Sequence, residues 1–296
     1  MSHPTIAVIG GDQRQYYAAC FLSAAGFPVV CLHTEGSPCG SSDSCKNLPA
    51  AASLEQALAE ADAVLLPMPL SKDKLHLNDR CAPNDAPVTL DALFAALHPG
   101  QILFGTGFPD TVLPLVQKKE LTILNYTAQP DFLCINSRLT AEGLLAELIS
   151  NTPFALRDSR ILLLGYGNCG EAIGRLLLPL SRKIYVLERE TQKLCTLTDC
   201  GFFPVTLDTI PDVLPHCDII INTIPDAVLK EKDLEILPKE CRVFDIASAP
   251  FGFPKDMTSR YDVPYYRLPG LPGKFSPQSA GILIGSMIER MMLHEL

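Results

Sequence analysis

The chain has no apolar run that approaches the length of about eighteen residues needed for a transmembrane helix. Basic residues are also few, with 24 Lys and Arg against 33 Asp and Glu and a formal net charge of −9. General affinity for nucleic acid or for an anionic membrane surface is therefore not expected. The first predicted strand starts near Thr5, which leaves no room for a signal peptide, and the expected location is cytoplasmic.

Paired cysteine motifs are missing as well. The eleven cysteines are scattered and contain no CxxC pair. Cys39 and Cys45 flank a loop rich in Gly and Ser, but no histidine cluster joins them. The sequence therefore predicts no metal site, and it predicts buried or loop thiols in a reducing compartment.

The length of 296 residues and an apolar content of 47% suit a two-domain α/β protein. Predicted strands at 5–9, 29–32, 63–69, 101–105 and 122–126 alternate with helices, and a second series begins at residue 160. We expect two doubly wound parallel-sheet domains, a flavodoxin-like or Rossmann-like substrate domain and a Rossmann NAD(P)-binding domain. The first covers residues 1–136 plus the C-terminal helix 275–296, and the second covers 137–274, with hinges near Asn136 and Leu271.

A glycine motif after a buried strand is the most informative feature of the second domain. The strand 161–164 runs into Gly165-x-Gly167-x-x-Gly170, and a second strand at 183–189 completes a βαβ unit. Gly165 permits a tight turn, Gly167 lets the backbone approach a pyrophosphate, and Gly170 allows close packing of helix on strand. These features predict a dinucleotide site, with a purely structural turn as the alternative. The predicted cofactor-binding residues are Gly165, Tyr166, Gly167, Asn168, Cys169 and Gly170.

The end of the next strand bears on which nucleotide is bound. An acidic residue at this place usually accepts hydrogen bonds from the adenosine ribose and favours NAD, whereas an Arg accommodates the 2′-phosphate of NADP. The chain offers both, Glu188 followed by Arg189. These residues leave NAD and NADP open.

Later strand ends supply further candidates. Asn222, Thr223 and Pro225 follow one strand, and Ser248 follows the next, facing the nicotinamide or the substrate. Lys274 is the one cation that enters the second hinge. The alternative is that these segments are only rigid, proline-terminated turns.

In the first domain, Gly11 and Asp12 precede Arg14, which combines backbone N–H groups with a guanidinium suited to a carboxylate. Ser71 follows the third strand and could supply a hydroxyl. Asn136 and Ser137 lie at the predicted domain junction, where Ser137 could instead cap a helix.

Histidine is missing from all of these segments. A hydroxy-acid dehydrogenase needs a general acid or base near the transferred hydride, commonly His. The six histidines, at positions 3, 33, 76, 98, 216 and 294, all fall outside the expected site. Either another group carries the proton, or the substrate loses it spontaneously.

With these residues in view, the chain resembles the dipicolinate synthase A-subunit family of spore-forming bacteria. The matching segments are 6–15, 136–143, 165–170, 221–225, 245–248 and 269–281. The resemblance implies oxidation and dehydration of 4-hydroxy-tetrahydrodipicolinate to pyridine-2,6-dicarboxylate in the mother cell of a sporulating bacterium. The implied cofactor is NADP, and the implied partner is a flavoprotein-like B subunit. Glu188 stands where family members carry a small residue, which keeps NAD open.

The positions and chemistry of the candidates give them expected roles. Ser248, Asn136 and Ser137 would be catalytic, and Gly11, Asp12, Arg14, Ser71 and Lys274 would bind substrate. A homo-oligomer is expected. Two other functions compete with this one: an NAD(P)-dependent oxidoreductase of the hydroxy-acid or alanine dehydrogenase type, and a non-catalytic nucleotide-binding subunit.

Overall fold

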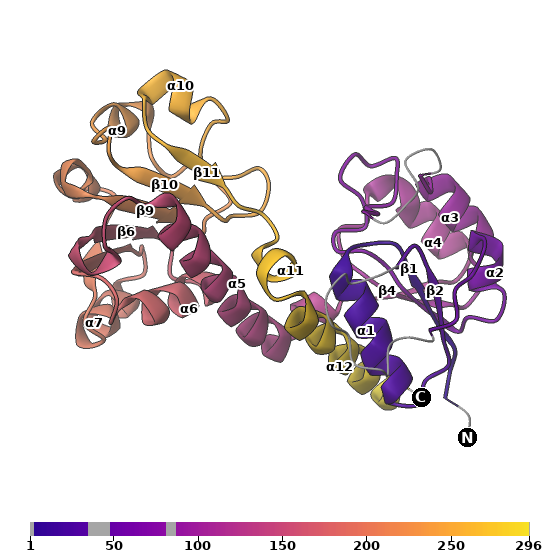
Figure 1. Ribbon diagram of the computed structural model, residues 1–296. Helices are drawn as coiled ribbons and strands as arrows, with labels where there is room; N and C mark the ends of the chain where they lie inside the picture. Colours follow the sequence, from indigo (N-terminus) through magenta and orange to yellow (C-terminus); the bar gives the residue numbers. More distant parts are fainter. Residues whose placement is uncertain (1–2, 35–47, 81–86, 296) are drawn as a thin grey trace. The chain divides into compact units, whose positions relative to one another are not determined.

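The computed structural model describes residues 3–34, 48–80 and 87–295. The chain divides into two compact units (Figure 1). Unit 1 comprises Met1–Asn136 and Ser276–Leu296, and unit 2 comprises Ser137–Phe275. Unit 2 is therefore an insertion within the sequence of unit 1. The loop that contains Cys39 and Cys45 lies outside the described residues.

Unit 1 is built on a five-stranded, all-parallel sheet with the order β2-β1-β3-β4-β5. This is the order of the flavodoxin-like doubly wound fold. The central strands are buried on both faces, so their sequences are apolar throughout instead of alternating. The strands are β1 Ile6–Ile9, β2 Val29–Leu32, β3 Ala63–Leu65, β4 Ile102–Phe104 and β5 Thr122–Leu124.

Helices cover both faces of this sheet. One face packs on α2, α3 and α4, and the other packs on α1 and the C-terminal helix α12. The helices α1 and α12 touch closely at glycines: a Cβ on Gly281 would lie 2.5 Å from the carbonyl oxygen of Arg14. The helices are α1 Gln13–Ala24, α2 Leu54–Leu58, α3 Leu90–Ala96, α4 Leu113–Lys118 and α12 Pro277–Glu295.

Unit 2 has a six-stranded parallel sheet with the order β11-β10-β9-β6-β7-β8. Numbered within the unit, this is the 3-2-1-4-5-6 order of the Rossmann fold. The predicted pair of doubly wound parallel sheets is therefore confirmed. The strands are β6 Arg160–Leu164, β7 Lys183–Leu187, β8 Phe203–Val205, β9 Ile219–Asn222, β10 Arg242–Asp245 and β11 Tyr265–Arg267.

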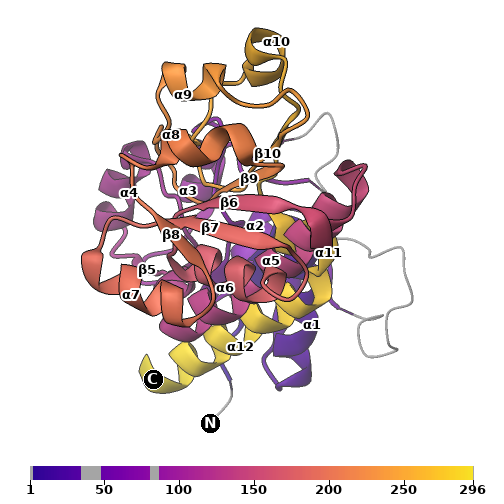
Figure 2. The ribbon, with the colours of Figure 1, turned by 90° about the vertical axis from the view of Figure 1, so that its left-hand side faces the viewer.

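In unit 2, helices α5, α6 and α7 lie on one face of the sheet, and α8, α9 and α10 lie on the other (Figure 2). Each layer buries its own apolar cluster against the strands. The helices are α5 Pro130–Asn151, α6 Asn168–Leu177, α7 Thr191–Asp199, α8 Ile210–Val213, α9 Glu231–Glu235, α10 Met257–Tyr261 and α11 Leu271–Phe275.

Two local expectations were wrong. Helix α5 begins at Pro130 instead of near Ser137, because proline suits the first position of a helix, where its missing N–H has no role. Asn136 is therefore inside a helix and not in a hinge loop, although the boundary of the two units falls there. The segment at Leu271, near which the second hinge was expected, forms the short helix α11, and the second boundary of the two units follows it directly.

Candidate functional site

The three glycines of the β6–α6 turn differ in what surrounds them. Gly165 has a φ of +92°, and a Cβ there would lie 2.7 Å from Ile224. A Cβ on Gly170 would lie 2.2 Å from the carbonyl oxygen of Gly165. A Cβ on Gly167 would meet nothing within 4 Å. Gly165 and Gly170 are thus required by the fold, whereas Gly167 borders open space.

That open space lies at the N-terminus of α6. Gly167 is the N-cap residue and offers no side chain to the helix. The backbone N–H groups of Asn168, Cys169 and Gly170 have no acceptor among the described residues. Unpaired N–H groups and the positive end of the helix dipole favour a phosphate at this position. The turn therefore has the form of a pyrophosphate cradle.

The aromatic ring of Tyr166 turns away from this cradle. It packs edge-on against Phe202, with ring centroids 5.5 Å apart. Burial raises the pKa of its hydroxyl, and the nearby charge of Glu171 adds to the effect. Tyr166 contributes its backbone to the turn and its ring to the apolar layer.

The carboxylate of Glu188 at the end of β7 folds back onto its own chain. Its Oε1 accepts hydrogen bonds from the backbone N–H groups of Arg189 (2.8 Å) and Glu190 (3.1 Å). Lys193 Nζ lies 4.0 Å from Oε2. The guanidinium of Arg189 is exposed and has no hydrogen bond or ion pair among the described residues. Glu188 is buried, so the guanidinium of Arg189 is the side-chain group that is exposed at the end of β7.

Asn222 and Thr223 at the end of β9 use their side chains within the protein. The Nδ2 of Asn222 donates to Ile224 O and to Asp245 Oδ1, both at 2.9 Å, and its Oδ1 accepts from Ile224 N at 3.1 Å. The hydroxyl of Thr223 donates to Leu164 O at 2.9 Å. These groups shape the loop that holds the exposed Pro225, and they have little capacity left for a ligand.

The fully buried Asp245 at the end of β10 organises the next loop. Besides Asn222, its carboxylate accepts from Ala247 N (3.2 Å), Gly252 N (3.1 Å) and the hydroxyl of Tyr265 (3.0 Å). Burial raises the pKa of Tyr265 to about 12. The loop carries Ser248, whose exposed hydroxyl has no partner among the described residues. Asp245 thus fixes the base of a loop that presents Ser248.

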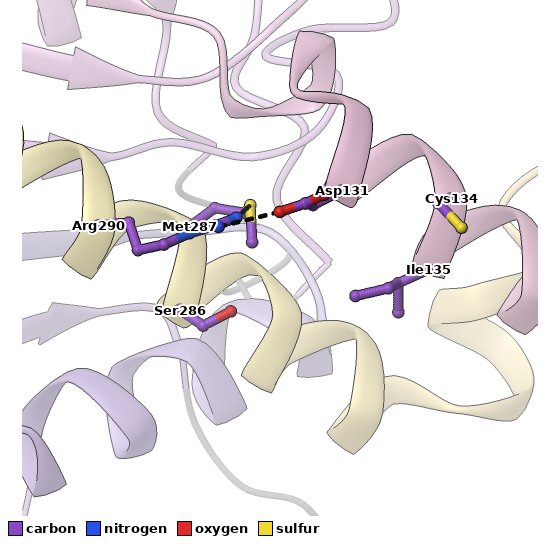
Figure 3. Close-up of a pocket in the computed structure, with 6 residues that line it drawn as sticks. All are labelled: Asp131, Cys134, Ile135, Ser286, Met287 and Arg290. Atoms are coloured by element: carbon purple, nitrogen blue, oxygen red, sulfur yellow. Dashed lines mark hydrogen bonds and ion pairs between the residues drawn. The ribbon is translucent and has the colours of Figure 1, made fainter.

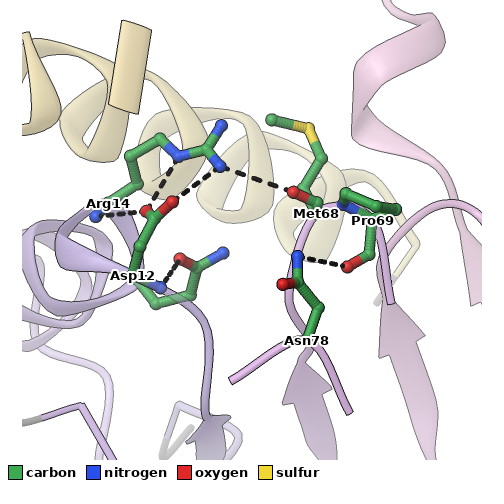
Figure 4. A network of polar contacts seen from close by, with 6 residues as sticks. Asp12, Arg14, Met68, Pro69 and Asn78 are labelled. Carbon is green, nitrogen blue, oxygen red and sulfur yellow. Dashed lines mark hydrogen bonds and ion pairs between the residues drawn. The ribbon is translucent and has the colours of Figure 1, made fainter. Parts of the chain in front are cut away.

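In unit 1, the turn after β1 holds an ion pair between the half-buried Asp12 and the buried Arg14. Asp12 caps α1, accepts from Arg14 N and forms a capping box with Gln15. Its carboxylate also accepts from the Nε and Nη2 of Arg14, both at 2.9 Å (Figure 4). Burial alone would raise the pKa of Asp12, but Arg14 and Arg80 outweigh it and hold the pKa below its usual range.

This pairing changes the expected role of Arg14. The Nε–Nη2 edge of the guanidinium is used by Asp12, and Nη2 also approaches Met68 O at 3.4 Å (Figure 4). Only Nη1 has no partner among the described residues. Because the side chain is just 9% exposed, little water can take the place of that partner. Two nearby buried donors, the Nε2 of Gln15 and the hydroxyl of Tyr126, also have none. Unsatisfied buried donors are rare in native proteins and indicate a ligand or an ordered water.

Other predicted substrate residues have structural partners. The hydroxyl of Ser71 donates to Asp73 and accepts from Lys74 N, which closes a turn. Asn78 next to it donates to Pro69 O at 3.1 Å (Figure 4). Lys274 forms an ion pair with Glu147 of α5. The structure therefore gives Ser71 and Lys274 an evident role in local structure.

Ser137 lies beside the β6–α6 turn. Its buried hydroxyl is 3.6 Å from the Sγ of Cys169, the second residue of α6. Asn136, one residue earlier on α5, belongs to unit 1. The structure thus gives Ser137 a place at the cradle.

One of the histidines that were expected to lie outside the site is paired with a carboxylate at the end of a strand. His33 follows β2 directly, and its Nδ1 lies 2.7 Å from the Oδ2 of Asp79. The two residues are 46 positions apart in the sequence, so no local motif predicts their contact. The only sequence signal was that His33 ends a strand, where ligands of doubly wound folds bind.

A separate depression lies between α5 and α12 (Figure 3). It is lined by Asp131, Cys134, Ile135, Ser286, Met287 and Arg290. Arg290 donates to Asp131 across it at 2.9 Å. It contains none of the predicted site residues.

Among the described residues no group of three or more His, Cys, Asp or Glu could hold a metal. In the same ranges no helix is long and apolar enough to span a membrane. Cys20 is disulfide-bonded, so the expectation of free thiols is wrong at that position. Cys31, Cys134, Cys169, Cys195, Cys200, Cys217 and Cys241 are free.

Comparison with known proteins gives consistent results. Residues 5–127 match the family of the dipicolinate synthase A-subunit N-terminal domain. The dipicolinate synthase A-subunit of Bacillus subtilis (strain 168) is 23% identical over 289 residues, which cover 97% of this chain and 95% of that protein.

Solved structures agree on the fold. The crystal structure of the dipicolinate synthase A-subunit from Bacillus halodurans has a TM-score of 0.85 at 22% identity, covering 99% of both chains. A transhydrogenase from Sinorhizobium meliloti has a TM-score of 0.71 at 13% identity, covering 98% of this chain and 94% of that one. The resemblance found in the sequence is thus confirmed: residues 5–127 match the N-terminal domain of the dipicolinate synthase A-subunit family, and nearly the whole chain is similar to one such A-subunit.

Proposed function

We propose that the chain is the A-subunit of a dipicolinate synthase. It would oxidise and dehydrate 4-hydroxy-tetrahydrodipicolinate to pyridine-2,6-dicarboxylate with a nicotinamide nucleotide. Similarity to a dipicolinate synthase A-subunit over 97% of the chain is the observation that carries the proposal. The partner would be a flavoprotein-like B subunit, the chain would form a homo-oligomer, and the setting would be the cytoplasm of the mother cell in a sporulating bacterium. These last three points rest on the family resemblance alone.

Unit 2 supports the nucleotide part of the proposal. The free N–H groups of Asn168, Cys169 and Gly170 suit a pyrophosphate, and the open space at Gly167 leaves room for it. The nicotinamide, when bound, accepts the hydride. Ser248, on the loop fixed by Asp245, would hydrogen-bond the nicotinamide or the substrate, and Ser137 would support the cradle through Cys169.

Unit 1 supports the dicarboxylate part. A dianion that binds a protein of net charge −9 needs local positive charge. Arg14 supplies it through Nη1, and the unsatisfied donors of Gln15 and Tyr126 would add neutral hydrogen bonds. Loss of a hydride, a proton and water gives an aromatic ring, so much of the driving force lies in the substrate. The protein mainly has to bind and orient it.

Turnover is tested by anaerobic incubation of enzymatically generated substrate with NAD or NADP, with and without the B subunit. Pyridine-2,6-dicarboxylate absorbance should rise only when a nucleotide is present. A different NAD(P) oxidoreductase would leave this substrate untouched while oxidising a hydroxy acid or an amino acid. Tight nucleotide binding with no turnover, even with the partner added, would instead indicate a non-catalytic role.

For the nucleotide itself we propose NADP. Oε1 of Glu188 is engaged with two backbone N–H groups, and Lys193 is close, so its charge is partly offset. The exposed Arg189 is free to clamp a 2′-phosphate.

Arg189→Ala should therefore weaken NADP binding about tenfold, or about 1.4 kcal/mol, and leave NAD nearly unchanged. Glu188→Ala should weaken NAD selectively. Titration of both nucleotides into both variants measures this. Equal losses for the two nucleotides would mean that neither side chain contacts the ribose.

A further inference from the structure

We infer that His33, held by Asp79, is the proton acceptor for the substrate bound at Arg14. The inference rests on the proposed function, which supplies the dicarboxylate and the hydride acceptor. No sequence motif marks the pair.

The pair of His33 and Asp79, here called the dyad, leaves one ring nitrogen of His33 able to accept a proton. Asp79 is a carboxylate and can only accept, so the 2.7 Å contact with Nδ1 makes this nitrogen the protonated one in the neutral ring. Nε2 then carries a lone pair, and it has no partner among the described residues. The side chain of Asp79 is 2% exposed and that of His33 is 21% exposed. A buried carboxylate thus orients a histidine that remains accessible.

The dyad and Arg14 flank the same turn. Gly10 N donates to Leu32 O at 2.8 Å, next to His33. Arg80 N donates to Gly11 O at 2.8 Å, which fixes the loop of Asp79 to that turn. A Cβ on Gly10 would lie 2.8 Å from Leu77 and 3.1 Å from the Cγ of Asp79, so a side chain there would crowd the carboxyl group.

Strand order then gives the spacing. His33 ends β2 on one side of β1, and Arg14 reaches Met68 just beyond β3 on the other side (Figure 4). Strands two apart in a sheet are separated by about 10 Å. The separation of the strand ends is comparable to the length of a six-membered ring with a hydrogen bond of about 3 Å at either end.

Backbone conformation supports a specific use of His33. Its φ is +54°, in the left-handed region that few residues other than glycine adopt. Strained residues of this kind cluster at functional sites.

In the proposed step the substrate loses a hydride, a proton and a water molecule. One ring C–H bond of the substrate breaks, and its electron pair leaves as hydride to the nicotinamide nucleotide. A proton on the neighbouring ring atom passes to Nε2 of His33, and the electrons of that bond form the new ring double bond. The hydroxyl and a second hydrogen leave as neutral water and need no net acceptor. The charged groups around the turn are Asp79 and Arg80 on its loop and Asp12 and Arg14 on α1.

The test compares three variants. His33→Asn keeps a residue that tolerates positive φ, and Asp79→Asn removes the acceptor that selects the tautomer. His76→Gln is the matched control, because His76 also pairs with a carboxylate, Asp73 at 2.7 Å, but on an exposed turn. We expect kcat to fall at least about a hundredfold in His33→Asn and substantially in Asp79→Asn. KM and nucleotide affinity should stay within about twofold, and His76→Gln should behave as wild type.

The pH profile adds a second readout. The acidic limb of kcat should be present in wild type and His76→Gln and absent in His33→Asn. An unchanged kcat or an unchanged acidic limb in folded His33→Asn would overturn the inference.

A third readout needs neither activity nor nucleotide. Nitrogen NMR of ¹⁵N-histidine protein should show His33 as the Nδ1–H tautomer and should show its Nε2 shifting when pyridine-2,6-dicarboxylate is added. His76 should not respond. A silent His33 would overturn the inference, and it would do so even if a variant fails to fold. A wild type that forms no product would overturn the proposed function instead, whereas the titration still reports whether His33 faces the dicarboxylate.

Discussion

Replacing Gly167 with valine is expected to leave the protein folded and to weaken nucleotide binding at least about tenfold, or about 1.4 kcal/mol. The backbone at Gly167 is extended, with a φ of −79° and a ψ of −165°, which valine adopts readily. A Cβ there touches nothing within 4 Å in the protein. The branched side chain would instead occupy the space over the free N–H groups of α6. Calorimetric titration with NADP and a thermal melt measure the two effects.

Gly170→Ala gives the opposite result and serves as the control. Its Cβ would lie 2.2 Å from the carbonyl oxygen of Gly165, so backbone must move and the melting temperature should fall. If Gly167→Val folds and binds nucleotide as well as wild type, the phosphate cradle is not at α6.

Arg14→Gln is expected to weaken pyridine-2,6-dicarboxylate binding on the order of ten- to a hundredfold. The substitution removes a buried, charge-assisted donor, which is worth about 1.5–3 kcal/mol. Nucleotide affinity should be nearly constant, because the nucleotide turn belongs to unit 2. Calorimetric titration with the dicarboxylate and, separately, with NADP distinguishes the two.

Two further variants make this result interpretable. Arg157→Gln changes the net charge equally from a side chain that is 85% exposed and should bind as wild type. Asp12→Asn combined with Arg14→Gln removes the half-buried carboxylate that would otherwise lose its partner. If Arg14→Gln instead weakens the nucleotide and spares the dicarboxylate, the assignment of unit 1 to substrate is wrong.

Local patterns in the sequence predicted the fold and the nucleotide turn well. The glycine at 165 has the positive φ that its tight turn requires, and the one at 170 is packed as the motif demands. Such features depend on neighbours within six residues, so they can be read directly from the chain.

The contacts of the proposed substrate residues could be predicted only in part, because they join residues that are distant in the sequence. The guanidinium of Arg14 was expected to be available for a substrate carboxylate, but its Nε and Nη2 donate to Asp12. Lys274 was expected as an anchor, and its partner Glu147 is 127 positions away. His33 was set aside, since its contact with Asp79 forms only when the chain folds.

The close packing of α12 on α1 has a consequence for biosynthesis. The face of the sheet that carries α1 stays partly uncovered until residues 277–295 have been made, and they follow all of unit 2 in the chain. At the usual ~5–20 residues per second, translation of unit 2 takes about 7–30 s. During that interval a nascent unit 1 lacks the residues of α12, such as Leu283 and Ile288, that complete this apolar cluster. Chaperones and proteases would therefore meet unit 1 in an incomplete form, whereas the continuous unit 2 can fold as it emerges from the ribosome.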